Sequence, residues 1–150
     1  MKYARVNYVK RFLALLIAFS VGGPLLAQAA AVKPESTLHI YRLRLDVGKA
    51  AHPTVSCDAF AIARIQNGRV YTMMISAGRH VFTVGEKTAA ITIDVEPGKE
   101  YFLRVDYPPN ASFAVGATAV VIDPAQGLKE IKKLRPLDGW LIENATCGRT

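Results

Sequence analysis

The clearest pattern in the chain is a series of short apolar runs between residues 67 and 107, with polar residues at alternating positions. The runs are rich in Val, Ile, Thr, Tyr and Phe, and Gly-containing breaks separate them. In the run 91–96, three β-branched residues alternate with polar ones. A period of two is typical of a strand with one face in the core and the other in water. Such runs at intervals of about 8–12 residues predict consecutive antiparallel strands of a sandwich or barrel.

The same pattern extends to both sides of this stretch. Asn67-Gly68 is the strongest hairpin signal, because both residues tolerate the positive φ of a tight primed turn. The second and third runs can also be read as one bent strand, so the expected total is about seven strands. The expected strands are 37–44, 55–60, 62–66, 70–75, 80–84, 89–96, 101–107 and 117–122.

The period changes after residue 122. Asp123 is suited to cap a helix, Pro124 to its first position, and Gln126 lies three residues after the cap. Apolar residues recur at helical spacing with lysines between them: Leu128, Ile131 and Leu134 with Lys129, Lys132 and Lys133. This predicts a short amphipathic helix over about 124–135, ended by Pro136. We expect it to lie on the sandwich or over one of its open ends.

These elements predict an all-β protein, an Ig-like or transthyretin-like β-sandwich with one short C-terminal amphipathic helix. We expect one domain over 37–150, preceded by a flexible leader over 30–36. Its tail, 136–150, contains the apolar segment Trp140-Leu141-Ile142, which we expect to tether the tail to the sandwich.

The first 29 residues have a different composition. Four basic residues and no acid precede a short apolar run, and Gly and Pro then lead to an A-x-A sequence at 27–29. This is the organisation of a secretory signal peptide. The alternative, a membrane anchor, needs about 20 apolar residues. We therefore expect cleavage after Ala29, export to the periplasm or the medium, and no transmembrane segment afterwards. No cysteine stands near the cleavage site to carry a lipid anchor.

Removal of this segment changes the charge of the protein. The whole chain carries a formal +7, but the expected signal holds four of its 19 basic residues and none of its 12 acids. The mature domain then has 15 basic and 12 acidic residues, a net charge of +3. A charge of this size, spread along the chain, does not indicate a nucleic-acid partner.

Cys57 and Cys147 are the only cysteines. An even number in an exported chain favours a disulfide between them. The alternative is two buried free thiols, which behave as small apolar residues. Neither cysteine has a second Cys or a His at the spacing of a structural metal site, so we expect no metal and no cofactor.

Several turns and strand starts follow one another in a recognisable order: 40–42 (IYR), 67–71 (NGRVY), 77–80 (AGRH), 96–102 (EPGKEYF) and 127–131 (GLKEI). Over about residues 37–135 the chain resembles a bacterial domain-of-unknown-function family of exported β-sandwich proteins, many of them lipoproteins. The resemblance places a His at the position of His80, where a structural role at the start of a strand is the simpler account, and no catalytic residue is carried over from it. Family members carry Asp-Gly where this chain has Asp58-Ala59, and Pro-Gly where it has Ala77-Gly78. The lipid-bearing Cys is absent here.

The candidate catalytic residues do not form a known pattern. The histidines, His39, His52 and His80, have no i, i+2 or i, i+4 pair that could share a metal. A hydrolase could be imagined around Ser56, or around Ser76 with His80, but neither serine lies in a nucleophile elbow. Nor is there a Gly-rich phosphate loop.

Two carboxylates, Asp94 and Glu96, are expected on the wet face of one strand. A solvated carboxylate keeps a low pKa that is unsuited to general-acid catalysis. We interpret both residues as solubilising charge.

A set of arginines is the candidate binding surface: Arg42, Arg44, Arg69, Arg79 and Arg104. With Lys87 and Lys99 they could gather into a basic patch for anionic envelope material. The alternative is a mixed-charge surface that keeps edge strands from pairing with other molecules, because Glu86, Asp94 and Glu100 are interleaved.

The sequence therefore predicts a non-catalytic exported envelope or periplasmic module that binds a protein partner or an envelope polymer. One alternative is a small periplasmic hydrolase with a site at one end of the sandwich. Another is a structural subunit whose edge strand accepts a partner strand.

Overall fold

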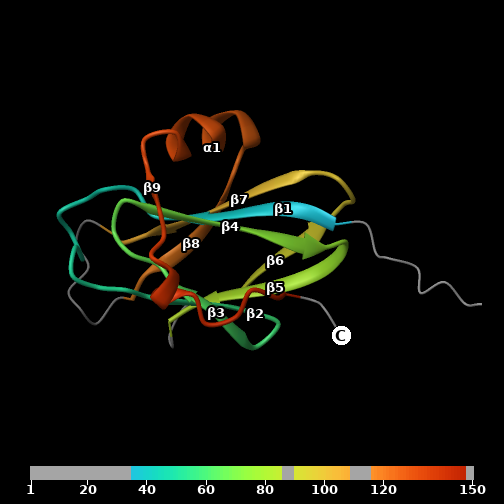
Figure 1. Ribbon diagram of the computed structural model, residues 1–150, viewed down its shortest axis with the longest axis horizontal. Coiled ribbons are helices and arrows are strands. Elements are labelled where there is room, and N and C mark those ends of the chain that lie inside the picture. The colour runs from blue at the N-terminus through green and yellow to red at the C-terminus, as the bar shows by residue number, and fades with distance from the viewer. Residues whose placement is uncertain (1–34, 86–89, 109–115, 148–150) are drawn as a thin grey trace, which may run out of the picture. The chain divides into compact units, whose positions relative to one another are not determined.

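Two β-sheets packed face to face form the body of the described part of the chain in the computed structural model (Figure 1). The structure describes residues 35–85, 90–108 and 116–147, all of which belong to one unit of the chain, 32–150. One sheet has the order β8 (Thr118–Ile122), β7 (Glu100–Asp106), β1 (Glu35–Tyr41), β4 (Arg69–Ser76), β9 (Arg135–Pro136). The other has the order β3 (Phe60–Arg64), β2 (Thr54–Cys57), β5 (Gly78–Val84), β6 (Ile91–Val95). The predicted all-β sandwich is confirmed.

The predicted signal peptide and its cleavage site lie outside the described residues, as does most of the predicted leader. The leader was expected to extend through residue 36, but β1 already begins at Glu35 and pairs with β4 from that residue onward. Among the described residues, no helix is long and apolar enough to cross a membrane.

The strands between residues 67 and 107 do not all pair with their neighbours in sequence. The chain changes sheets between β3 and β4, between β4 and β5, and between β6 and β7. β1 lies in the middle of its sheet, antiparallel to β4 and parallel to β7. Alternation predicts strands but not their partners, because it reports only which face of each strand is buried.

The turn at Asn67-Gly68 forms, but it is not the predicted hairpin. Gly68 has a φ of +72°, whereas Asn67 is not among the residues with positive φ, and the Arg69 N–H donates to the Gln66 carbonyl over 3.3 Å. The turn connects β3 in one sheet to β4 in the other. The Asn-Gly dipeptide favours a tight local turn. Such a turn can connect two sheets as well as two strands of a hairpin.

A primed turn occurs instead at Asp58-Ala59, inside the range predicted as the strand 55–60. Asp58 has a φ of +49° and Ala59 a φ of +71°, and the turn joins β2 to β3. Val55 and Cys57 share a fully buried face as expected, but Ala59 is exposed at the turn. A turn that requires positive φ at both residues is most often built from Asn-Gly or Asp-Gly, and here alanine stands at its second position.

The core has two parts, one on each face of the β1 sheet. Between the sheets, fully buried apolar side chains from both meet, including Leu38, Ile40, Val55, Ile62, Phe82 and Leu103. On the outer face, Tyr41, Phe102 and Ile122 form a smaller cluster with Ile131 and Leu134. Because β1 is covered on both sides, its side chains are buried at nearly every position.

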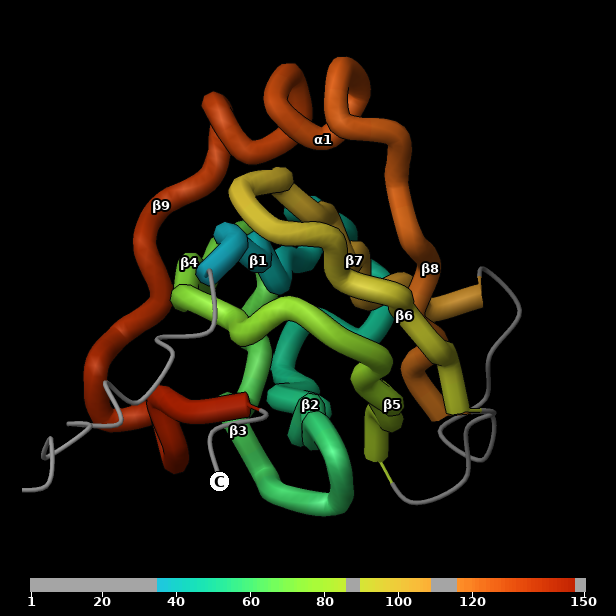
Figure 2. The backbone as a smooth tube through the Cα atoms, turned by 90° about the vertical axis from the view of Figure 1, so that its right-hand side faces the viewer, coloured from blue at the N-terminus to red at the C-terminus, as the bar shows by residue number. Residues whose placement is uncertain are grey.

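Helix α1 (Pro124–Ile131) covers this smaller cluster and lies on the outer face of the β1 sheet (Figure 2). Its predicted cap is confirmed, since Asp123 Oδ1 accepts hydrogen bonds from Ala125 N at 2.9 Å and Gln126 N at 3.4 Å. The helix ends at Ile131 rather than near 135, because the following chain joins β4 as strand β9.

One predicted contact of the helix is wrong. Leu128 is 40% exposed, and the helix instead rests on Phe102 through Gly127. A Cβ at Gly127 would overlap the Phe102 ring. The close approach of α1 to the Phe102 ring therefore requires glycine at position 127. The spacing of apolar residues along the helix does not predict this requirement.

The C-terminal tail is tied to the sandwich at several points. Leu141 in the short 3-10 helix η1 (Gly139–Leu141) is fully buried, but its neighbour Trp140 is 66% exposed. The backbone N–H groups of Leu137 and Glu143 donate to Val70 and Ile62 carbonyls, each over 2.8 Å. The expected apolar tether thus consists mainly of Leu141.

Candidate functional site

A cavity of about 310 Å³ opens where three connections meet at one end of the sandwich. These are the loop after β1, the turn before β4 and the chain between α1 and β9, which lie together at the left in Figure 1. We call this cavity the basic pocket, because its ionisable lining residues are Arg44, Lys49, His52, Arg69, Lys133 and Arg135. No acidic residue lines it among the described parts of the chain.

Two polar side chains hold the loop after β1 in place. Asn67 accepts from Leu45 N at 3.1 Å through Oδ1 and donates to the Leu45 carbonyl at 2.8 Å through Nδ2. Arg42 is 1% exposed, and its guanidinium donates to the Ala51, Val47 and Gly48 carbonyls at 2.8–2.9 Å. These bonds fix the backbone on which Lys49 is carried.

Arg42 was a candidate for the binding surface, and its burial corrects that prediction. Its guanidinium lies 4.4 Å from the centroid of the Tyr107 ring. Burial lowers the pKa of Arg42, while Tyr107 and Asp106 act in the opposite direction. Arg42 is a structural residue because the loop folds around its charge.

The positive charge of the basic pocket is largely uncompensated. Arg44, Lys49, Lys133 and Arg135 are exposed, and none forms an ion pair with another described residue. Only Arg69 has a partner, with Nη2 3.7 Å from Asp138 and Nη1 donating to the Pro136 carbonyl at 3.1 Å. Cations gathered in a concave site focus the electrostatic field and attract anions.

The remaining predicted arginines lie elsewhere and are neutralised. Arg79 donates to Asp94 at 2.9 Å on the outer face of the other sheet. Arg104 pairs with Asp106 and Glu130 beneath α1, each at 2.9 Å. The pKa of Arg104 is raised by Asp106 and then by Glu130, against the effect of burial. The five predicted arginines therefore do not form one surface, and only Arg44 and Arg69 reach the pocket.

Sequence reasoning missed the other cations of the basic pocket. Lys49 lies in a loop, and Lys133 and Arg135 follow the helix, so the three come from segments far apart in the chain. An exposed aromatic ring adds to this region, since the Trp140 ring centroid is 6.5 Å from that of His52. The Arg64 guanidinium lies 5.7 Å from the centre of the same Trp140 ring.

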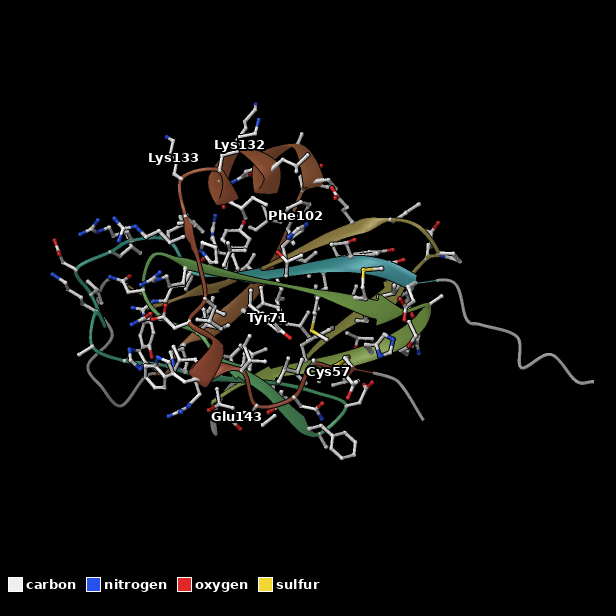
Figure 3. All side chains as sticks on the ribbon, in the orientation of Figure 1. Cys57, Tyr71, Phe102, Lys132, Lys133 and Glu143 are labelled. Carbon is white, nitrogen blue, oxygen red and sulfur yellow. A yellow bond between two sulfur atoms is a disulfide. The ribbon has the colours of Figure 1, made fainter. Side chains whose placement is uncertain are left out.

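The sandwich also carries a closed cluster, centred on the predicted disulfide. Cys57 and Cys147 are bonded, with their Cα atoms 5.7 Å apart, as expected. His80 is 4% exposed and lies beside them, its Nδ1 2.7 Å from Asp58 Oδ2 and 3.7 Å from Cys147 Sγ. Figure 3 shows Cys57 on the lower sheet, away from α1. We call these four residues the cysteine–histidine cluster.

Every polar atom of this cluster that faces inward has a partner. His80 Nε2 donates to the Ser76 carbonyl at 2.9 Å, and Asp58 Oδ1 accepts from Val81 N at 2.9 Å. Burial by itself would raise the pKa of Asp58, but the Val81 N–H and the His80 ring outweigh it and hold this pKa below its usual range. Both ring nitrogens of His80 therefore lie within hydrogen-bond distance of an oxygen.

The structure thus brings Ser76, His80 and Asp58 together, but not as a catalytic triad. The Nε2 atom that would activate a serine hydroxyl is bonded to the Ser76 backbone carbonyl instead. His39 lies apart, stacked on Phe102 at 4.7 Å between ring centroids and bonded through Nδ1 to Thr72 Oγ1 at 2.8 Å. Burial lowers the pKa of His39, although Glu100 acts against it.

The predicted solubilising carboxylates lie in the outer part of the sandwich and are paired. Asp94 bonds to Arg79, and Glu96 is 2.6 Å from Lys99 Nζ. A second cavity of about 330 Å³ is lined by both, with Lys99, Glu100 and Asp123. Its mixed charge contrasts with the basic pocket.

No family model, no curated protein and no solved structure matches this chain. The resemblance to an exported envelope family therefore stays a prediction.

Proposed function

We propose that this chain is a non-catalytic exported β-sandwich module of the envelope or periplasm that binds an anionic polymer at the basic pocket. The observation that carries the proposal is the lining of this cavity by five cationic side chains with no acid among its described residues. Four of these cations form no ion pair with another described residue, so they are free to meet an anionic ligand.

Export is supported by two features. The N-terminal sequence has the organisation of a signal peptide. The disulfide between Cys57 and Cys147 suits an oxidising compartment. The proposed module is of the Ig-like or transthyretin-like kind, in which loops at the ends of the sandwich present binding surfaces.

The ligand class follows from the chemistry of the pocket. Guanidinium and ammonium groups bind phosphate, sulfate or carboxylate oxygens. A pocket of about 310 Å³ holds one or a few such groups at a time. A polymer would therefore lie across it and extend toward the exposed ring of Trp140, on which a sugar ring could stack.

A non-catalytic role is supported by the surroundings of two of the histidines, His39 and His80. The hydrolase alternative would need one of the histidines to activate a serine or a water. Both nitrogens of His80 are occupied by Asp58 and the Ser76 carbonyl, and His39 is packed against Phe102.

Titration of the purified chain with dextran sulfate tests this proposal, with neutral dextran as the comparison polymer. Trp140 is the only tryptophan, so intrinsic tryptophan fluorescence reports directly on the region next to the pocket. We expect saturable binding of dextran sulfate that weakens with added salt, and no binding of neutral dextran.

Two adjacent lysines provide a matched pair of variants. Lys132 and Lys133 are both exposed at the end of α1 (Figure 3), but only Lys133 lines the basic pocket. Lys133→Ala should weaken binding of dextran sulfate several-fold, and Lys132→Ala should leave it near the wild-type value. Equal affinities for the two variants, or equal binding of both polymers, would contradict the proposed site.

A further inference from the structure

The cysteine–histidine cluster has the composition of a metal site. Cys57, Asp58, His80 and Cys147 each offer one ligand atom, and these four atoms all lie within 4.8 Å of one another. Three segments of the chain supply them: the β2–β3 hairpin, strand β5 and the C-terminal tail. Because these segments are distant in sequence, the spacing of the four residues does not predict a metal site.

The distances suit a tetrahedral zinc ion. Zinc bonds of about 2.3 Å to sulfur and about 2.0 Å to nitrogen or oxygen place neighbouring ligand atoms about 3.3–3.8 Å apart. His80 Nδ1 is 3.7 Å from Cys147 Sγ and 2.7 Å from Asp58 Oδ2. The two sulfur atoms, which are bonded to each other here, would have to move apart, and the His80–Asp58 pair would have to open from its hydrogen-bonded distance.

The partners of these groups also have the arrangement found around metal ligands. His80 Nε2–H donates to the Ser76 carbonyl, which directs the ring and leaves Nδ1 as the ligand atom. Asp58 Oδ1 accepts from Val81 N, which leaves Oδ2 facing His80. The cysteines and His80 are buried, while the side chain of Asp58 is 33% exposed and provides access from solvent.

We propose that, when the disulfide is reduced, Cys57, Cys147, His80 and Asp58 bind one Zn²⁺ ion. A dithiol reductant transfers two electrons to the disulfide, becomes a cyclic disulfide itself and leaves two cysteine thiols. Zinc then displaces the two thiol protons and any proton on His80 Nδ1, and binds two thiolates, one imidazole and one carboxylate. The metal replaces the covalent bond as the link between the tail and the β2–β3 hairpin.

Cobalt(II) titration of the reduced chain tests this proposal. The purified chain is reduced, freed of reductant under nitrogen and titrated with Co²⁺, whose spectrum reports thiolate bonds and tetrahedral geometry. We expect one Co²⁺ per reduced chain, a thiolate-to-cobalt charge-transfer band, and displacement by one equivalent of Zn²⁺. The oxidised chain should show no such band. Absence of the band in the reduced chain would overturn the proposal.

Variants distinguish the four-ligand site from binding by the thiols alone. In their reduced forms, His80→Gln and Asp58→Asn should each bind Co²⁺ at least about tenfold more weakly than wild type. Loss of a group that only hydrogen-bonds to a metal ligand already weakens binding by about this factor, and loss of the ligand itself should weaken it more. Wild-type affinity and spectrum in both variants would contradict the assignment.

Thermal unfolding provides a second readout that does not depend on the variants. Zn²⁺ should raise the Tm of the reduced chain and leave that of the oxidised chain unchanged. If reduction alone unfolds the chain, Zn²⁺ should restore its near-ultraviolet circular dichroism. Failure of Zn²⁺ either to raise the Tm or to restore the spectrum would count against the site.

Discussion

The two ends of strand β4 lie in regions that differ in whether their charged groups have partners. At Ser76 the strand meets the cysteine–histidine cluster, where buried groups are bonded to one another and each inward-facing polar atom has a partner. At Arg69, about 23 Å away for eight residues of strand, it enters the basic pocket, where four cations have no ion-pair partner among the described residues.

This difference indicates that the cysteine–histidine cluster serves stability and the basic pocket serves ligand binding. Paired, buried groups contribute to the free energy of unfolding, because breaking one pair leaves the other member buried and unsatisfied. Unpaired surface cations contribute little to stability, but they are available to a ligand. Substitutions in the cluster should therefore change stability and leave polymer binding intact, and substitutions in the pocket should do the reverse.

The largest effect is expected from loss of the disulfide. Cys57 and Cys147 are 90 residues apart in sequence, and closing a loop of this length stabilises the fold by about 4–5 kcal/mol in the chain-entropy model. Cys147→Ser, compared with wild type in urea unfolding, should lose most of this stability. The tail after Pro136 should also become more sensitive to protease, although Leu141 still anchors it. An unchanged urea midpoint would contradict this account.

Removing the charge of Asp58 should have the next largest effect on stability. Asp58→Asn keeps a residue that tolerates positive φ but weakens the bond to the buried His80, so we expect a loss of about 2 kcal/mol. The matched control is Asp94→Asn, whose partner Arg79 is 73% exposed, and its effect should be much smaller than that of Asp58→Asn. Equal losses in the two variants would show that burial of the pair is unimportant.

The Arg104–Glu130 network beneath α1 is a third region with paired charges. It tests whether a paired cation contributes to stability rather than to polymer binding. Arg104 lies under α1 and shares Glu130 with Tyr41, whose hydroxyl donates to Glu130 Oε2 over 2.6 Å. Glu130→Gln should lower stability by about 1.5 kcal/mol without weakening polymer binding. Chemical unfolding and dextran sulfate titration of the same variant would check both parts.

The pH dependence of this network has a definite sign. Burial alone would raise the pKa of Glu130, but hydrogen bonds from Tyr41, Gln126 and Arg104 outweigh it and lower this pKa. A lowered carboxyl pKa contributes stability above the pKa of the unfolded chain, and this contribution is lost as pH falls through the folded value. Wild type should therefore lose stability in acid more steeply than Glu130→Gln, and parallel acid profiles would contradict this reading.

A smaller and opposite effect is expected at the β2–β3 turn. Ala59 adopts a φ of +71°, which costs a residue with a side chain about 1 kcal/mol relative to glycine. Ala59→Gly should raise stability by up to about 0.5 kcal/mol after the entropy of the unfolded chain is included. Ala51→Gly, at a position where φ is not positive, is the control and should not stabilise the protein. Thermal unfolding of both variants would check this.

The sequence predicted those features that depend on local pattern. Alternation located the strands, and Asp123 with Pro124 located the start of α1, because capping and pleating act over a few residues. The pairing of the strands was not predictable in this way: Asn67-Gly68 has the dipeptide of a hairpin yet connects two sheets. The contact of Gly127 with Phe102 was not predictable either, because it depends on how closely the helix approaches the sheet.

The site was less predictable than the fold, because its parts converge only in three dimensions. Arg42 and Arg44 are two residues apart, yet the loop folds around the first and exposes the second. The helical pattern predicts Lys133 as one of the polar residues of the helix. It does not predict that Lys133 lines the same pocket as Lys49. Likewise, His80 and Cys147 are 67 residues apart and meet only because the tail returns to β5.

The salt dependence of dextran sulfate binding tests the central claim most directly. Each cation that contacts a polyanion steepens the fall of log affinity with log salt by about 0.7–0.9. The double variant Arg44→Ala/Lys133→Ala removes two cations of the basic pocket, and Arg79→Ala/Lys132→Ala removes two exposed cations outside it. Both lose the same formal charge. We predict a slope shallower by about 1.5 for the pocket variant and a nearly unchanged slope for the control. Equal slopes in the two double variants would show that the polymer responds to net charge alone, and would contradict the pocket as the binding site.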